Sequence, residues 1–123
     1  MNKRVFGLLT TIMLVVSLVS LPSYAEQTAG YDTSGRTKVA SVKNDTVNPA
    51  TAFGRLQPTY GVAILQICNS NGTLVYVSDT YPVYPWHGNI SCGIGANGVI
   101  RSYYVLPDET STNIYGKLNY GIS

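Results

Sequence analysis

Charged side chains are scarce in this chain. They make up 11% of its 123 residues, which include two cysteines, one histidine and one tryptophan. Acid–base catalysis and metal binding need several acids, histidines or cysteines brought together, and no spacing typical of either occurs here. Asp108 and Glu109 are adjacent, so in a strand they would point to opposite faces and could not flank one glycosidic bond. We therefore expect no enzyme activity, no metal site and no cofactor.

The chain begins with two basic residues, Lys3 and Arg4, followed by an apolar run over residues 5–21 that leads to a Ser-Tyr-Ala sequence. A basic start, an apolar segment and small residues at the −3 and −1 positions predict a secretory signal peptide cleaved after Ala25. The run is short for a membrane span of about 20 apolar residues, and an uncleaved N-terminal anchor is the alternative. We expect a secreted bacterial protein with a helical leader over residues 1–25 and no stable membrane insertion after cleavage.

Loss of the leader changes the charge of the protein. Lys3 and Arg4 leave with it, so six basic side chains remain against six acids, and the net charge falls from +2 to zero. Nucleic acids and strongly anionic membranes are bound through clusters of basic residues, and no basic run survives in the mature chain. This composition excludes nucleic acid as a partner.

The two cysteines, Cys68 and Cys92, form an even set in a chain that we expect to be exported. Disulfides form readily outside the cytoplasm, and the spacing matches neither a redox motif nor a zinc site. We therefore predict a structural Cys68–Cys92 disulfide. The closed ring of about 25 residues would contribute about 3 kcal/mol in the chain-entropy model.

The mature part of the chain has the pattern of a β protein. No stretch keeps apolar residues at helical spacing for three turns, whereas short runs of Val, Ile, Leu, Thr and Tyr alternate with Gly, Pro and Asn. The pattern predicts an all-β fold: a small antiparallel β-sandwich or barrel of five to seven short strands. Residues 26–36 are polar and predict a loose N-terminal arm, and residues 37–123 predict a single β domain.

Particular strands are predicted within this domain. Residues 37–43 alternate weakly, as in an edge strand, and the apolar run 61–68 and residues 73–78 flank an Asn-Ser-Asn-Gly turn, which predicts a hairpin. Residues 91–95 and 99–106 flank Asn97-Gly98 and predict a second hairpin, with Tyr103 and Val105 on one face. The last strand is expected over residues 113–120, with Ile114, Leu118 and Tyr120 inward.

One segment departs from the strand pattern and is the candidate binding site. Residues 80–93 contain two prolines, the only tryptophan and the only histidine. Prolines limit the loss of entropy on binding, and large aromatic side chains provide contact area, which together favour a recognition loop. The alternative is that these aromatic side chains cover one end of the core. The predicted binding residues are Tyr81, Tyr84, Trp86 and His87.

Two classes of function are consistent with these features. The first is a small secreted, non-catalytic binding protein whose aromatic loop docks a protein or a glycan on a cell surface or in the medium, with an inhibitor as a variant of this class. The second is a secreted bacteriocin-like toxin or effector that acts on cell envelopes. Neither class has a motif of its own in this sequence, so the distinction depends on the structure and on experiment.

Overall fold

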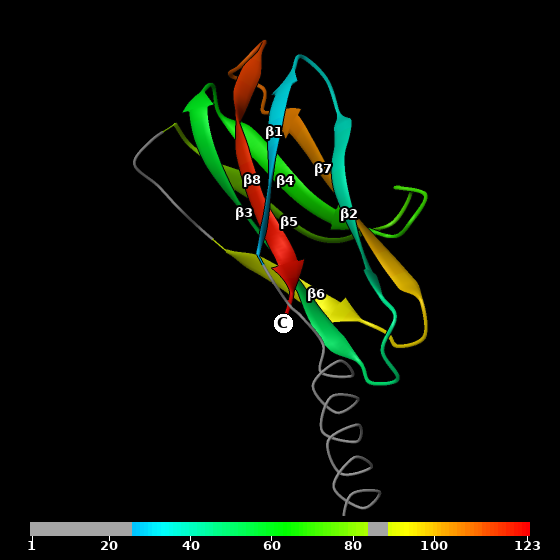
Figure 1. Cartoon of the computed structure of the whole chain (residues 1–123). Helices are drawn as coiled ribbons and strands as arrows, with labels where there is room; N and C mark the ends of the chain where they lie inside the picture. Colours follow the sequence, from blue (N-terminus) through cyan, green and yellow to red (C-terminus); the bar gives the residue numbers. More distant parts are fainter. Residues whose placement is uncertain (1–25, 84–88) are drawn as a thin grey trace, which may run out of the picture.

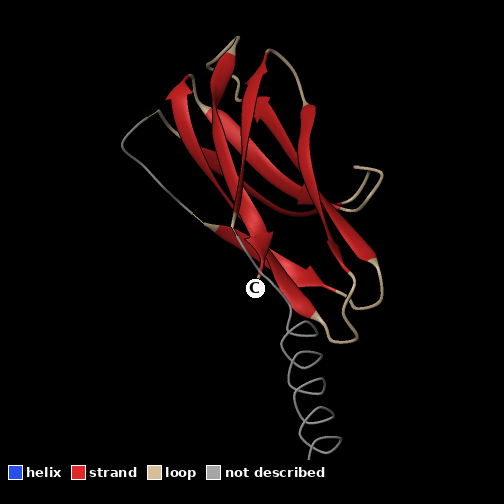
Figure 2. Ribbon diagram, viewed as in Figure 1, coloured by secondary structure: helices blue, strands red, loops and turns tan. Residues whose placement is uncertain are grey.

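The structure, a computed structural model, describes residues 26–83 and 89–123. This part of the chain forms eight strands. Figure 2 shows it as strands and loops, without a helix. The strands are β1 (Gln27–Thr33), β2 (Thr37–Asn44), β3 (Ala50–Tyr60), β4 (Ala63–Cys68), β5 (Val75–Tyr81), β6 (Ile90–Ile94), β7 (Val99–Pro107) and β8 (Ile114–Ile122). The predicted all-β class is confirmed, but the strand count is eight rather than five to seven. The predicted leader, residues 1–25, lies outside the described residues.

The eight strands form two antiparallel sheets of four strands each, in a sandwich-like arrangement (Figure 1). The first sheet has the order β1-β8-β3-β6 and the second the order β2-β7-β4-β5. The chain changes sheet at each described connection except the one between β4 and β5. Most neighbouring strands in a sheet are therefore far apart in the sequence.

The core lies between the two sheets and is supplied by alternating residues of both. Tyr103 and Val105 of β7 are fully buried, as are Ile114 and Leu118 of β8. The inward positions predicted for Ile114 and Leu118 are confirmed, and Tyr103 and Val105 share one face of β7 as the alternation of the sequence predicts. The predicted edge strand is also confirmed, because β2 lies at the edge of the second sheet.

The first predicted hairpin is confirmed. Strands β4 and β5 pair antiparallel, and the turn between them is closed by the Gly72 amide, which donates to the Asn69 carbonyl at 3.1 Å. Gly72 has a φ of 75°, a left-handed conformation that glycine adopts without strain. The turn chemistry of the sequence therefore identifies this connection correctly.

The predicted loose arm is wrong, because most of it forms β1. This strand pairs along its whole length with β8, and Tyr31 is 6% exposed in the core. The local sequence contains a single large apolar side chain, which is too weak a signal for a strand. Backbone pairing with β8 and burial of one ring define β1, and both are long-range contacts.

The second predicted hairpin is also wrong, although both of its strands exist. Strand β6 pairs with β3 in the first sheet, and β7 pairs with β2 and β4 in the second. Asn97 and Gly98 do form a turn with positive φ, but their amides donate to the Thr46 and Asn44 carbonyls at 2.8 and 2.7 Å. These hydrogen bonds hold the turn against the β2–β3 connection. The turn joins β6 of the first sheet to β7 of the second sheet.

Strand β3 is the longest strand and has no counterpart in the sequence-based prediction. Its inward positions are Ala52, Gly54, Leu56 and Pro58, of which only Leu56 has a large apolar side chain, so the apolar alternation is weak. Gly54 is required by its surroundings: a β carbon there would lie 2.8 Å from a ring carbon of Tyr103 in the opposite sheet. The Tyr103 ring of the second sheet thus fills the space that a side chain at Gly54 of the first sheet would occupy.

The predicted Cys68–Cys92 disulfide is not formed, and both thiols are free. Cys68 is buried at the end of β4, where Arg36 donates to its Sγ at 3.4 Å and to Oε1 of Gln66 at 2.9 Å. Cys92 lies in the other sheet, half-buried against the core cluster. The Arg36 contacts place Cys68 on the side of its sheet that Gln66 occupies, whereas Cys92 faces the core. The number of cysteines in a sequence gives no information about the directions in which their side chains point, so the disulfide prediction failed.

Candidate functional site: two stacked tyrosines between two hollows

Tyr60 and Tyr115 form an exposed aromatic pair at one end of the first sheet. Their ring centroids lie 5.4 Å apart and their planes differ by 8°. The two side chains are 55% and 42% exposed, so the pair is solvated although it is ordered by stacking. We refer to Tyr60 and Tyr115 as the tyrosine pair.

A β-bulge in β3 produces this pair. The register between β3 and β8 shifts between Pro58 and Tyr60, where Thr59 is the extra residue. Without the bulge, Tyr60 would share the inward face of Leu56 and Pro58. The extra residue turns the Tyr60 side chain to the other face of the sheet, where it lies opposite Tyr115.

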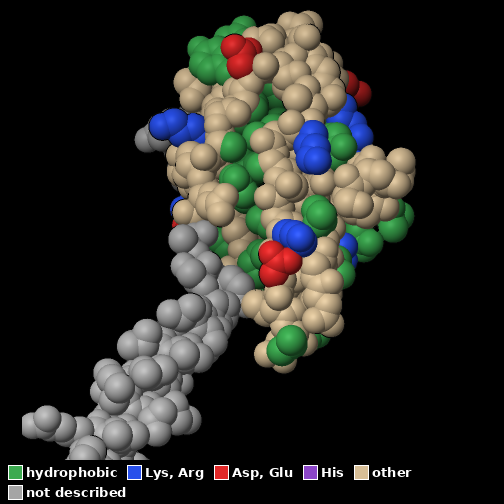
Figure 3. All heavy atoms as spheres, turned by 45° about the vertical axis from the view of Figure 1, so that its right-hand side comes forward, with side chains coloured by type: hydrophobic (Ala, Val, Ile, Leu, Met, Phe, Trp, Pro, Cys, Tyr) green, Lys and Arg blue, Asp and Glu red, His purple; other side chains and the backbone are tan. Residues whose placement is uncertain are grey.

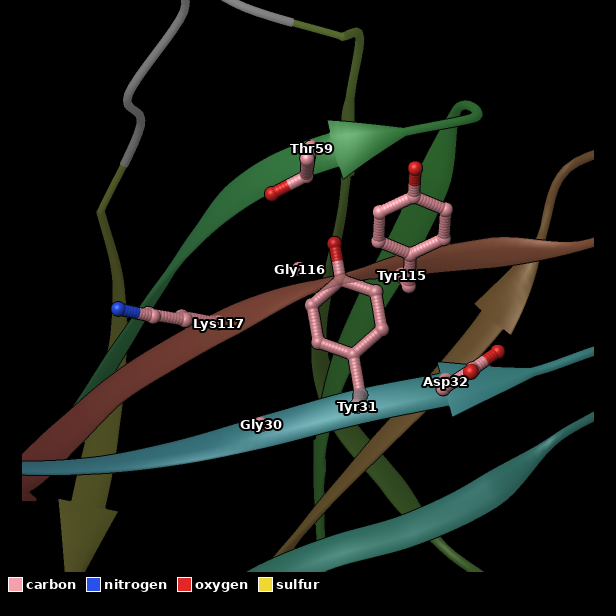
Figure 4. A pocket seen from close by; sticks show the side chains of 7 residues that line it. All are labelled: Gly30, Tyr31, Asp32, Thr59, Tyr115, Gly116 and Lys117. Carbon is pink, nitrogen blue, oxygen red and sulfur yellow. The ribbon is translucent and has the colours of Figure 1, made fainter.

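The first hollow lies beside Tyr115 and has a volume of about 450 Å³. Figure 4 shows its lining, which comes from β1, β3 and β8. Besides the hydroxyls of its two tyrosines, its polar side-chain groups are the carboxylate of Asp32, the hydroxyl of Thr59 and the ammonium of Lys117. Gly30 and Gly116 contribute no side chain, so the backbone of β1 and β8 is accessible there.

Tyr31 also lines the first hollow, and its hydroxyl has no hydrogen-bond partner among the described residues. In Figure 4 this hydroxyl points across β8 at Gly116 toward Thr59. Burial raises the pKa of Tyr31 to about 12, because an ionised phenolate would be poorly solvated here. The phenol is therefore protonated at physiological pH and keeps its capacity to donate a hydrogen bond.

The second hollow lies beside Tyr60 and has a volume of about 500 Å³. Besides Tyr60 it is lined by Gly61, Val62, Val83, Thr110, Ser111, Thr112 and Asn113. The Val62 amide donates to Oγ of Ser111 at 2.8 Å, which fixes the β3–β4 turn against the β7–β8 loop. The lining is therefore rich in hydroxyl and amide groups and is held in place by hydrogen bonds.

The predicted binding residues are only partly described. Tyr81 is the last residue of β5 and is fully buried in the core, so its ring is not available to a ligand, which corrects that part of the prediction. Tyr84, Trp86 and His87 lie outside the described residues. Val83, which precedes them, borders the second hollow. Tyr60 and Tyr115 are not among the residues predicted from the sequence, and their only local signal is that a glycine follows each of them.

Other kinds of site find little support in the described part of the chain. Within residues 26–83 and 89–123, no group of three or more histidine, cysteine, aspartate or glutamate side chains is placed to hold a metal ion. The same two ranges contain no helix with the length and apolarity that a membrane crossing requires. On the face in Figure 3, positive and negative side chains are interspersed, so no patch of one charge dominates it.

Comparison with known proteins gives no relationship from which a function can be transferred. No protein-family model matches the chain, and no curated protein matches it in sequence.

Proposed function

We propose that this protein is a small secreted, non-catalytic binding protein whose ligand is held at the tyrosine pair. The observation that carries the proposal is the stacking of two exposed tyrosine rings between two hollows. Large aromatic side chains supply much of the binding energy at protein surfaces, and adjoining exposed aromatic side chains are typical of an interaction site.

The pair is also ordered before a ligand arrives. Stacking restricts both rings, the bulge at Thr59 fixes the position of Tyr60, and the Ser111 hydrogen bond holds the adjoining turn. A ligand therefore immobilises few additional side chains on binding, which lowers the entropic cost of association.

The proposal includes the aromatic loop of residues 84–88. Val83 borders the second hollow, and Trp86 follows it by three residues, so Trp86 is the residue of this loop that we propose as a further contact. Export through the leader, with cleavage after Ala25, belongs to the same proposal. The partner is a protein or a glycan on a cell surface or in the medium.

Co-sedimentation of the purified mature protein with isolated bacterial cell envelopes tests the proposal. We expect Tyr60→Ala and Tyr115→Ala together to weaken binding about tenfold or more, the usual effect of truncating central aromatic contacts. Val47→Ala is the matched control, because Val47 is 78% exposed and precedes the other end of β3. Melting curves should show that each variant stays folded. If the double variant binds like the wild type, the tyrosine pair is not the site.

A further inference from the structure

We infer that the ligand at the tyrosine pair is a neutral oligosaccharide chain, with sugar units in both hollows and the stacked rings between them. The inference rests on the proposed function and names its ligand class. It follows from the charge of the hollows, the chemistry of their lining groups, their position on either side of the pair, and the unpartnered hydroxyl of Tyr31.

The charge of the two hollows favours a neutral ligand. The first contains one carboxylate, Asp32, and one ammonium, Lys117. Among the described residues, the lining of the second contains no acid, lysine, arginine or histidine. Phosphate-bearing ligands are bound by groups of basic side chains, and the described residues of neither lining provide such a group.

The lining chemistry favours a sugar. A pyranose ring has apolar C–H faces and a rim of hydroxyl groups, so it needs an aromatic face with hydrogen-bonding groups around it. Tyr115 and Tyr60 supply the faces, while Thr59, Thr110 and Asn113 are among the polar groups that border them. A mostly apolar wall with a few directed polar groups is typical of small-ligand sites.

The position of the hollows favours a chain rather than a single sugar. Tyr115 lines the first hollow and Tyr60 lines the second, so the two rings border different hollows while they stack on each other. One sugar can occupy one hollow only. Linked sugars occupy both, and the second contact is then formed at high effective concentration, which raises the affinity of the chain.

Tyr31 provides an independent indication of a ligand. It is 6% exposed, lines the first hollow and has a hydroxyl without a partner among the described residues. A buried hydroxyl without a hydrogen bond is unfavourable for the folded protein. The hydroxyl oxygen is itself enclosed, so a sugar hydroxyl in the hollow would accept the hydrogen bond that Tyr31 can donate after a small shift of the ring toward the hollow.

The inference is tested by titration calorimetry of the purified mature protein with soluble oligosaccharides. The probes are hexamers and dimers of β-1,4-linked glucose, β-1,4-linked N-acetylglucosamine, β-1,4-linked mannose and α-1,4-linked glucose. We expect at least one hexamer to bind about tenfold more tightly than its dimer, because the longer chain has enough sugar units to fill both hollows and to cover the rings between them. Tyr60→Ala and Tyr115→Ala should each weaken binding of that hexamer about tenfold.

Tyr31→Phe refines the test, with Tyr81→Phe as its matched control. Both tyrosines are buried, and both hydroxyls lack a partner among the described residues, but only Tyr31 borders the first hollow. We expect Tyr31→Phe to weaken hexamer binding several-fold with no loss of thermal stability, and Tyr81→Phe to leave binding unchanged. Equal effects of the two variants on binding would contradict the role of Tyr31.

The result that overturns the inference can be separated from failure of the proposed function. If no hexamer binds, or if hexamer binding survives both alanine substitutions, the ligand at the pair is not a neutral oligosaccharide. Envelope co-sedimentation is then repeated after digestion of the envelopes with proteinase K. Loss of tyrosine-dependent binding after digestion would identify a protein partner and leave the proposed function standing. Tyrosine-independent binding to undigested envelopes would remove the proposed function itself.

Discussion

The hydroxyl of Tyr31 lies over Gly116, so close that a β carbon added to Gly116 would stand 2.7 Å from it. The same β carbon would lie 2.5 Å from the Gln57 carbonyl oxygen and 2.9 Å from the Cα of Pro58. Two of these three neighbours are backbone atoms and cannot move without disturbing β3. The absence of a side chain at Gly116 therefore allows β1, β8 and β3 to pack as observed.

Gly116→Ala should lower the free energy of unfolding by about 2–3 kcal/mol, because an overpacked site forces its neighbours to shift. Urea unfolding of the wild type and the variant measures the change. Gly93→Ala is the control in the same sheet, since nothing lies within 4 Å of the β carbon it would add. A loss of stability equal to that of the control would show that the close contacts around Gly116 are relieved at no cost.

Tyr103→Phe should be destabilising by about 1–3 kcal/mol. The Tyr103 hydroxyl donates to the Phe53 carbonyl at 2.6 Å, across the sandwich, and its removal leaves that carbonyl without this bond. Tyr81→Phe removes an equally buried hydroxyl that has no partner in the described part of the chain, so we expect a change of less than about 0.5 kcal/mol. Thermal or urea unfolding of the two variants compares them directly. Equal losses would mean that the Tyr103 hydrogen bond does not contribute.

Alkaline pH should destabilise the protein. Burial raises the pKa of Tyr31 and of Tyr81 from 10.0 to about 12, with Asp79 adding to the effect on Tyr81, and burial also raises the pKa of Tyr103. Above pH 10 the unfolded chain loses protons that the folded chain retains, so the free energy of unfolding falls as pH rises. The stabilisation is complete below pH 10 and is lost progressively toward pH 12.

The free energy of unfolding should fall by at most about 1.4 kcal/mol per pH unit for each of these tyrosines. Urea midpoints measured from pH 8 to pH 12 would report it, and Tyr31→Phe should make the curve less steep. A free energy of unfolding that is constant over this range would exclude the proposed burial of the phenols.

Both cysteine thiols should be free. Burial raises the pKa of each thiol, and Arg36 and Arg101 only partly oppose this for Cys68 and Cys92 respectively. In the native state both should therefore alkylate slowly at neutral pH, Cys92 before the fully buried Cys68, and faster as pH rises. Mass spectrometry of protein alkylated with iodoacetamide checks the order. Protein purified without reductant should give two thiols per chain after denaturation, and none would indicate a disulfide.

The sequence predicts those parts of the fold that depend on neighbouring residues. Alternation puts Tyr103 and Val105 on one face of β7 and predicts Ile114 and Leu118 inward on β8, because successive side chains of a strand point to opposite faces whatever the strand pairs with. The β4–β5 hairpin is likewise local, since its turn residues lie between its two strands. The aromatic loop was singled out by composition alone, and three of its four predicted contacts stay predictions.

By itself, the sequence determined the β class, the inward face of β8 and one hairpin, because these follow from the period of a strand and the backbone freedom of turn residues. Tertiary structure decided which strands share a sheet, since pairing β1 with β8 or β6 with β3 depends on contacts between distant segments. It also decided the candidate site. The bulge at Thr59 moves Tyr60 to the face of Tyr115, and only the pairing of β3 with β8 brings the two rings together.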